Sequence, residues 1–279
     1  MSVSLWQAVL LGALQGLTEF LPVSSTAHLA LAQHFLPGFR QPGILFDVML
    51  HVGTLVAVVV FFRARLAATF KGLVGGDTPE RKRSVRLVLC LVVAVACTGA
   101  VTLPLKSVAV EGMTDFRRMG AALVAMAVLL LVAQRAARQR GEAGRGLEEV
   151  GLLDAALVGA LQSVSAVFHG FSRSGNTISV GLFRGLSRRA AAEFSFLLSI
   201  PTILAAAAVE NLHAVRENPA AFTADGALGA YAAGMVVAGV VGYFAVSTLL
   251  RLVVSLKLLP FVVYCGALGT LLLAAPPGR

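Results

Sequence analysis

Six long apolar runs constrain the fold of this chain more than any other feature. They cover residues 43–62, 87–105, 119–134, 194–210, 228–250 and 258–275. About 20 consecutive apolar residues span the hydrocarbon core of a bilayer as a helix, so each run is long enough to cross a membrane with modest tilt. The sequence therefore predicts an all-α, polytopic membrane protein with six transmembrane helices.

The composition excludes other classes of protein. Of the 279 residues, 57% are hydrophobic and 13% are charged, against roughly 45–50% and 25% in a soluble domain. A soluble domain, a disulfide scaffold or a disordered chain does not have this balance. The net charge of +9 is typical of nucleic-acid binders only when the basic residues share one face, and here they lie between apolar runs. We therefore expect membrane lipids, and no nucleic acid, as partners.

Two further apolar stretches, 5–35 and 152–184, are interrupted near their middles by Pro, Gly, Ser, Thr and ionisable residues. Non-helical backbone persists at membrane depth only where protein or a water-filled cavity satisfies its peptide groups. Both stretches are predicted to be re-entrant helix-loop-helix elements.

The basic residues predict the orientation, and seven of them fall in the loop expected between the first two spans, residues 63–86. With six spans, 16 of the 23 Lys and Arg residues fall on one side, which the positive-inside rule makes cytoplasmic. Both termini then face outward, and Arg173 is left inside the second broken stretch. We expect a single integral membrane domain over 1–279.

The two broken stretches resemble each other. Residues 13–15 and 160–162 both read Ala-Leu-Gln, and Ser25 matches Ser172 at the same offset of 147. Each half, about 1–140 and 150–279, contains one broken stretch and three spans. Because three is odd, the second half enters the membrane upside down, which predicts an inverted repeat whose polar tips meet near the midplane.

The first tip concentrates chemistry-bearing side chains. Gln15 and Glu19 are four residues apart and share a helix face. Pro22 ends that helix, and Ser24, Ser25 or Thr26 can cap the next one, directing free amide groups at the break. His28 follows within one turn. An ionisable residue inside a membrane segment is functional by default, which favours a functional site over a purely structural one.

The second tip, residues 169–177, suits an anion. Gly170 and Gly175 let backbone approach a ligand, and Arg173 offers a bidentate fork for phosphate oxygens. The hydrogen-bonding side chains at this tip are Ser172, Ser174, Asn176 and Thr177. Placed tip to tip, the two halves predict a phosphate or pyrophosphate site. Glu19, with Gln15, would hold a divalent cation such as Mg²⁺ or Ca²⁺, or Glu19 would act as a general base.

The stretches 16–28 and 170–177, together with 193–198 and Pro201, resemble the bacitracin-resistance type of bacterial undecaprenyl pyrophosphate phosphatases. The resemblance covers nearly the whole chain. It implies an inner-membrane enzyme that removes the terminal phosphate of undecaprenyl pyrophosphate on the outer side, recycling the lipid carrier for peptidoglycan synthesis. By position it makes Glu19, His28 and Arg173 essential and Ser25 a nucleophile.

The chain departs from the family pattern at two positions. Gln15 stands where many members have a second Glu, and His169 replaces the usual proline. Gln15 weakens any scheme that needs two carboxylate metal ligands. We interpret His169 as a surface-facing substitution.

Several alternatives stay open. Ser25 or His28 would attack phosphorus, or one of them would activate water. Inverted repeats also build transporters, so a flippase for undecaprenyl phosphate or another anionic lipid is the second hypothesis. Asp47 and His51 either support the site or lie at the outer interface, and we favour the interface. A homodimer is one option for the oligomeric state.

Overall fold

The computed structural model describes residues 3–39, 44–105, 115–139, 144–217, 228–255 and 258–278, and within these ranges it is helical, without a strand. The predicted all-α class is confirmed. The α-helices are α1 (Leu5–Phe20), α2 (Ser25–Phe35), α3 (Ile44–Phe61), α4 (Arg63–Val74), α5 (Pro79–Thr102), α7 (Phe116–Gln139), α8 (Leu152–Val167), α9 (Arg173–Phe183), α10 (Arg188–Glu217), α11 (Leu228–Val254) and α12 (Leu259–Ala274). Two short 3₁₀ turns cover Leu103–Leu105 and Leu147–Glu149.

Four helices are long and apolar enough to cross a membrane by themselves: Pro79–Leu105, Phe116–Gln139, Arg188–Val209 and Leu228–Val254. A fifth span exists if Phe46–Phe61 and Arg63–Val74 count as one, although the two are bent by 71°. The sixth predicted span, 258–275, is the 16-residue helix α12. The structure therefore supports four or five spans by length and composition.

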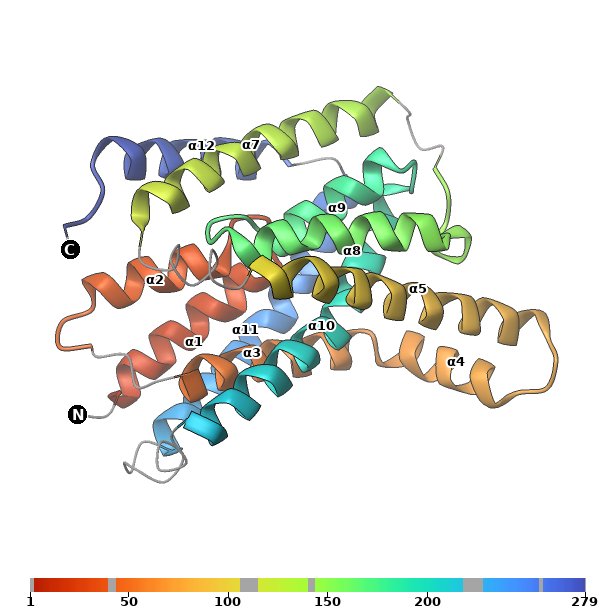
Figure 1. Cartoon of the computed structure of the whole chain (residues 1–279), viewed down its shortest axis with the longest axis horizontal. Helices are drawn as coiled ribbons and strands as arrows, with labels where there is room; N and C mark the ends of the chain where they lie inside the picture. Colours follow the sequence, from red (N-terminus) through yellow and green to blue (C-terminus); the bar gives the residue numbers. More distant parts are fainter. Residues whose placement is uncertain are drawn as a thin grey trace.

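The region between the first two predicted spans differs from the expected basic loop. Residues 63–74 form α4, which packs against the beginning of α5. In Figure 1 the two helices extend side by side away from the rest of the molecule. Thr78 caps α5 by accepting a hydrogen bond from the Arg81 amide at 3.2 Å, and Pro79 follows at the first helical position, where its missing N–H costs nothing.

Both broken stretches form two helices separated by a short break, as the sequence predicts. The first helix ends at Phe20 and the next begins at Ser25, with Pro22 between them. Pro22 lacks the backbone donor that would continue the helix. The second break lies between Val167 and Arg173. The matching helices have equal lengths, 16 residues for α1 and α8 and 11 for α2 and α9.

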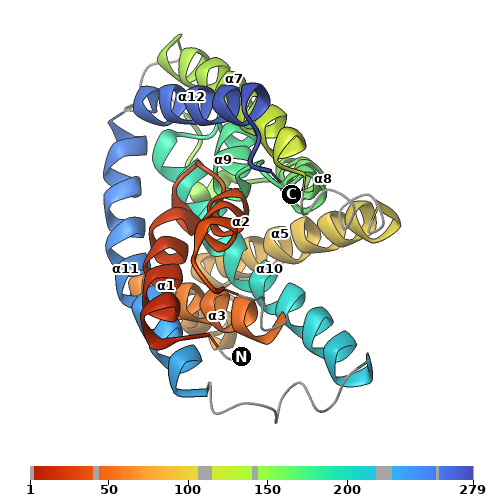
Figure 2. The same cartoon turned by 90° about the vertical axis from the view of Figure 1, so that its left-hand side faces the viewer.

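Each broken element packs against a long helix of the other half. The most extensive contact of α1 is with α11 (Figure 2), and α8 lies along α5 (Figure 1). The helices approach closely at glycines in matching positions. A Cβ at Gly12 would clash with the backbone of Gly234, and a Cβ at Gly159 with that of Ala94. The helices α7 and α12 pack on each other along one side of the molecule.

A buried carboxylate anchors the start of α8. Asp154 accepts hydrogen bonds from Arg145 at 2.7 Å, from Arg184 at 2.8 Å and from the Gly151 amide at 3.0 Å. These bonds join the segment before α8 to the end of α9. The hydrogen bond to Asp154 also raises the pKa of the Arg145 guanidinium. The first turn of α8 is thereby fixed, and the second tip follows the last turn of the same helix.

Candidate active site

The carboxylate of Glu19 lies at the centre of the site. Glu19 is in the last turn of α1, and the side chain of Gln15, one turn earlier, donates from Nε2 to Glu19 Oε2 at 3.1 Å. Both residues are buried. A buried carboxylate needs hydrogen-bond donors and positive charge to offset its lost hydration. The structure supplies these from three elements.

The hydroxyl of Ser25 is the second donor, reaching Glu19 Oε2 at 2.7 Å. Ser25 is the first residue of α2, and Ser24 before it has φ 71° and ψ 98°. Residues with a Cβ seldom adopt this left-handed backbone. Ser24 Oγ caps α2 by accepting from the Ala27 amide at 3.4 Å and is 3.0 Å from Thr26 Oγ1. The strained turn thus brings Ser25 back onto Glu19, and such strain tends to occur at functional sites.

Arg173 brings the second tip to the same carboxylate. Its guanidinium Nη2 donates to Glu19 Oε1 at 2.6 Å, and the two side chains are 16% and 6% exposed. Arg173 is the first residue of α9, and Ser172 caps this helix by accepting from the Gly175 amide at 3.2 Å. The two tips therefore meet, with Glu19, Gln15, Ser25 and Arg173 in one hydrogen-bonded cluster.

Two serines of the second tip join the breaks to each other. Ser172 Oγ and Ser174 Oγ each donate to the backbone oxygen of Leu21 at 3.3 Å, and they are 3.1 Å apart. Gly175 lies against the first break, where an added Cβ would come within 2.9 Å of Pro22 Cβ. These residues hold the tips together from within the protein.

The remaining candidates of the second tip also have partners inside the protein. Asn176 Nδ2 donates to the backbone oxygen of Leu161. Thr177 Oγ1 donates to the Arg173 carbonyl at 2.9 Å, so the bond to Ser195 Oγ at 2.6 Å is donated by the serine. Gly170 has φ +108°, and a Cβ there would meet the backbone of Met119. Of the candidates at the second tip, Arg173 is the one whose side chain binds Glu19.

The structure gives His28 partners other than Glu19. His28 Nδ1 is 2.7 Å from the Ser24 carbonyl, which can only accept, so Nδ1 carries the proton. His28 Nε2 then accepts from the Tyr264 hydroxyl at 2.6 Å, and the two rings stack with centroids 5.5 Å apart. Tyr264 belongs to α12, and no sequence motif marked it as a candidate.

His51 lies nearer to Glu19 than the sequence suggested. Its Nε2 is 3.8 Å from Glu19 Oε2, and its Nδ1 is hydrogen-bonded to the backbone oxygen of Asp47 at 2.8 Å. The favoured prediction, that Asp47 and His51 lie at the outer interface, does not account for the contact of His51 with Glu19. The spacing of Asp47 and His51 on one helix face was the signal for the alternative.

The cluster offers two oxygen donors that suit a divalent cation. Gln15 Oε1 is buried without a hydrogen-bond partner among the described residues, beside the carboxylate of Glu19. Mg²⁺ is commonly bound through one or two protein oxygens together with substrate phosphates. The described residues contain no group of three His, Cys, Asp or Glu able to hold a metal. These two side chains would fill only part of the coordination of a divalent cation, which would take its remaining ligands from water or a bound molecule.

His169 precedes Gly170 at the second break and is half-buried. Its Nδ1 is buried and has no hydrogen-bond partner in the ranges that the structure covers. The prediction that His169 faces the surface is therefore wrong for its Nδ1 atom.

Known proteins resemble this chain over nearly its whole length. The family model of the bacitracin resistance protein BacA matches residues 8–271. A protein of Syntrophotalea carbinolica named undecaprenyl-diphosphatase is 40% identical over 274 residues, covering 98% of this chain and 99% of the relative. Relatives of the same name from Treponema denticola and Gemmatimonas aurantiaca are 41% and 40% identical, covering 96% and 99% of this chain and 96% and 100% of the relatives. Because the family match spans nearly its whole length, this chain belongs to the bacitracin resistance protein BacA family.

Proposed function

We propose that this chain is an undecaprenyl-diphosphatase, which hydrolyses undecaprenyl pyrophosphate to undecaprenyl phosphate and inorganic phosphate and so recycles the lipid carrier for peptidoglycan synthesis. The name of its relatives supports this activity. One observation carries the assignment: a buried carboxylate, Glu19, binds a hydroxyl and a guanidinium that come from two separate broken elements. This is the arrangement of base, nucleophile and charge stabiliser that phosphoryl transfer needs.

Ser25 is the nucleophile in this proposal. Its Oγ–H already points to Glu19 Oε2, so Glu19 takes the proton as Oγ attacks the terminal phosphorus. The bond from phosphorus to the bridging oxygen breaks, and the proton on Glu19 passes to the departing lipid phosphate. Water, deprotonated by Glu19, then attacks the phosphorus of the phosphoserine. The bond from phosphorus to Ser25 Oγ breaks, Glu19 returns the proton to Oγ, and inorganic phosphate leaves. The alternative in which Ser25 orients an attacking water uses the same base.

Arg173 stabilises the negative charge on the transferring phosphoryl group. Before substrate binds, its guanidinium is paired with Glu19. The terminal phosphate is a second anion that the Arg173 guanidinium can bind. The charge spread over the phosphoryl oxygens increases in the transition state. Gln15 and Glu19 would hold Mg²⁺ or Ca²⁺, which would neutralise pyrophosphate charge when bound. The bonds of Ser172 and Ser174 to the Leu21 carbonyl, and of the Gly175 amide to Ser172, keep Arg173 in position.

His28 acts as a positioning residue in this scheme. Its bonds to the Ser24 carbonyl and to Tyr264 stabilise the strained turn that places Ser25. A direct attack by His28 would first require the loss of the Tyr264 hydrogen bond at Nε2. A transporter or flippase would need Arg173 for an anion, but it would have no use for a hydroxyl bound to a carboxylate, so we favour the hydrolase.

We further propose the complete topology: six spans, two re-entrant elements and inverted repeats over about 1–140 and 150–279, in the bacterial inner membrane. The equal lengths of the paired helices and the reciprocal packing of α1 on α11 and α8 on α5 support the repeat. The distribution of basic residues supports an active site that opens to the outer side. A homodimer stays a prediction.

The test is release of inorganic phosphate from undecaprenyl pyrophosphate by the purified protein in detergent, with Mg²⁺ or Ca²⁺ present. We expect Glu19→Gln to lower the rate by about 10²–10⁴-fold, the range for loss of a general base, while substrate binding is retained. Glu80→Gln, an exposed carboxylate on α5, is the matched control and should keep full activity. If the wild-type protein releases no phosphate, the proposal is wrong.

A further inference from the structure

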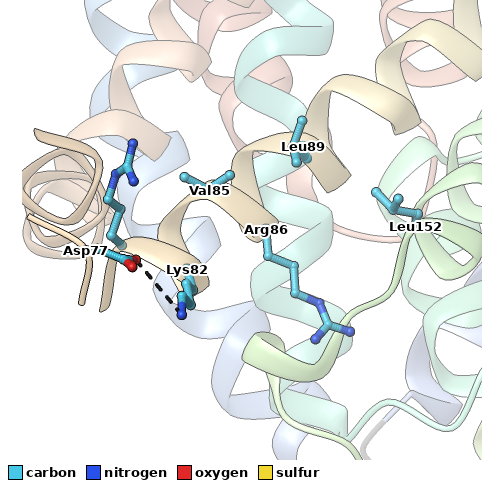
Figure 3. A pocket seen from close by; sticks show the side chains of 7 residues that line it. Asp77, Lys82, Val85, Arg86, Leu89 and Leu152 are labelled. Carbon is cyan, nitrogen blue, oxygen red and sulfur yellow. Dashed lines mark ion pairs between the residues drawn. The ribbon is translucent and has the colours of Figure 1, made fainter. Parts of the chain in front are cut away.

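A cavity unrelated to Glu19 lies at the opposite end of α8. It has a volume of about 600 Å³ and is formed by the first turns of α5 and the first residue of α8 (Figure 3). Its lining includes Arg81, Lys82, Arg86, Val85, Leu89 and Leu152. Since α8 has 16 residues and rises 1.5 Å per residue, roughly 24 Å of helix separates this cavity from the second tip.

The rim of the cavity carries excess positive charge. Lys82 forms an ion pair with Asp77 at 3.9 Å. Arg86 donates instead to the backbone oxygens of Val150 at 2.9 Å and Glu149 at 3.4 Å, which fix it beside the start of α8. Backbone oxygens carry no net charge, so these two bonds do not neutralise the Arg86 guanidinium. Among the described residues no carboxylate lies within ion-pair distance of Arg81 or Arg86. The cavity is thus suited to an anion.

An exposed apolar surface continues directly from the rim. Lys82, Arg86, Leu89 and Val92 recur at helical spacing on one face of α5, where Leu89 is 49% and Val92 58% exposed. On α8, Leu152 is 54% exposed. Pro79–Leu105 is apolar and long enough to cross a membrane, so we expect this exposed surface to face hydrocarbon. A soluble anion would need the basic rim but not the apolar surface below it.

We propose that this cavity binds an anionic membrane phospholipid of the cytoplasmic leaflet. The phosphodiester of the headgroup lies among Arg81, Lys82 and Arg86, and an acyl chain lies along Leu89 and Val92. Basic pockets between transmembrane helices on the cytoplasmic side bind anionic headgroups in this way. Such a lipid would join α5 to the start of α8, the two helices that already pack together.

The experiment measures binding of dioleoyl phosphatidylglycerol and dioleoyl phosphatidylcholine to the delipidated full-length protein by native mass spectrometry. We expect phosphatidylglycerol to be preferred. The double variant Arg81→Gln/Lys82→Gln should weaken its binding roughly 30-fold, about fivefold for each basic side chain near a membrane surface. The control Arg135→Gln/Arg138→Gln removes two exposed charges on α7, expected on the same side, and should bind like the wild type.

Three outcomes would overturn the proposal: equal affinity of the wild type for the two lipids, equal weakening in the control variant, or competition by glycerol phosphate as strong as by the whole lipid. The last result would indicate a soluble anion. If the double variant does not purify as a folded protein, Arg81→Gln and Lys82→Gln are measured singly. Each is then expected to weaken phosphatidylglycerol binding about fivefold, and unchanged binding in both contradicts the proposal.

Discussion

At the scale of single residues, the site depends on the hydrogen bond from Ser25 Oγ to Glu19 Oε2 at 2.7 Å. We predict that Ser25→Ala lowers kcat by at least 10³-fold with a small change in KM, because the nucleophile acts in the chemical step and contributes little to ground-state binding. The measurement is steady-state phosphate release. The control is Ser255→Ala, which changes an exposed serine directly after α11.

An acid-quench experiment on the wild type should trap a phosphoserine at residue 25. If Ser25→Ala keeps most of the wild-type kcat, water is the attacking group and the covalent step is wrong.

Tyr264 provides a second test at this scale. Tyr264→Phe keeps the ring that stacks on His28 but removes the hydroxyl bonded to Nε2. Leaving a largely buried polar atom unpaired costs about 1–3 kcal/mol, so we expect a lower Tm. Because His28 is a positioning residue in our scheme, kcat should fall less than tenfold. A loss of 100-fold or more, without a change in Tm, would instead indicate that His28 takes part in the chemistry.

The sequence predicted this cluster only in part. Glu19, Ser25 and Arg173 were found because ionisable and hydroxyl groups are rare inside apolar stretches. Tyr264 and the contact of His51 were not found, since each depends on how α12 and α3 pack against the tips. Ser172 and Ser174 were identified as polar, but their bonds to the Leu21 carbonyl connect residues about 150 positions apart, which no local pattern reveals.

At the scale of elements, local chemistry accounts for the two breaks and long-range packing for the rest. Pro22 and the capping residues Ser24 and Ser172 mark helix ends in the sequence itself. The helix α4 was predicted as a loop because Arg63, Arg65 and Lys71, three of its 12 residues, interrupt its apolar positions. The long spans 87–105, 119–134, 194–210 and 228–250 were recognised because hydropathy alone defines them.

The contact of α1 with α11 gives a prediction for this scale. A Cβ at Gly12 would meet the backbone of Gly234, which has no room to move. We expect Gly12→Ala to destabilise the protein by about 1–3 kcal/mol, as overpacking does. The readout is a lower Tm in detergent.

Gly229→Ala is the control for Gly12→Ala, since Gly229 lies on the exposed start of α11 with nothing within 4 Å of its Cβ. It should be neutral or slightly stabilising because alanine favours helix. Equal Tm values for the two variants would mean that α1 and α11 do not pack as described.

At the scale of the whole molecule, the predicted orientation places the α4–α5 turn in the cytoplasm and the C-terminus outside. Gly76 and Gly278 lie in open space, so a cysteine is tolerated at either position. A membrane-impermeant thiol reagent applied to intact spheroplasts should label Gly278→Cys and not Gly76→Cys.

After lysis, both cysteine variants should react. The parent protein should react weakly because Cys90 and Cys265 are buried, and the half-buried Cys97 lies within the candidate membrane span Pro79–Leu105. Labelling of Gly76→Cys from outside would reverse the orientation and with it the side to which the active site opens.

The most direct test of the account is a structure of the protein bound to a non-hydrolysable methylene-bisphosphonate analogue of a polyprenyl pyrophosphate. We predict that the terminal phosphorus lies about 3–3.5 Å from Ser25 Oγ, the distance of a productive approach, with its oxygens on the Arg173 guanidinium and its lipid chain in the bilayer. An anion bound away from both broken elements would contradict the central claim that the two tips together form the phosphatase site.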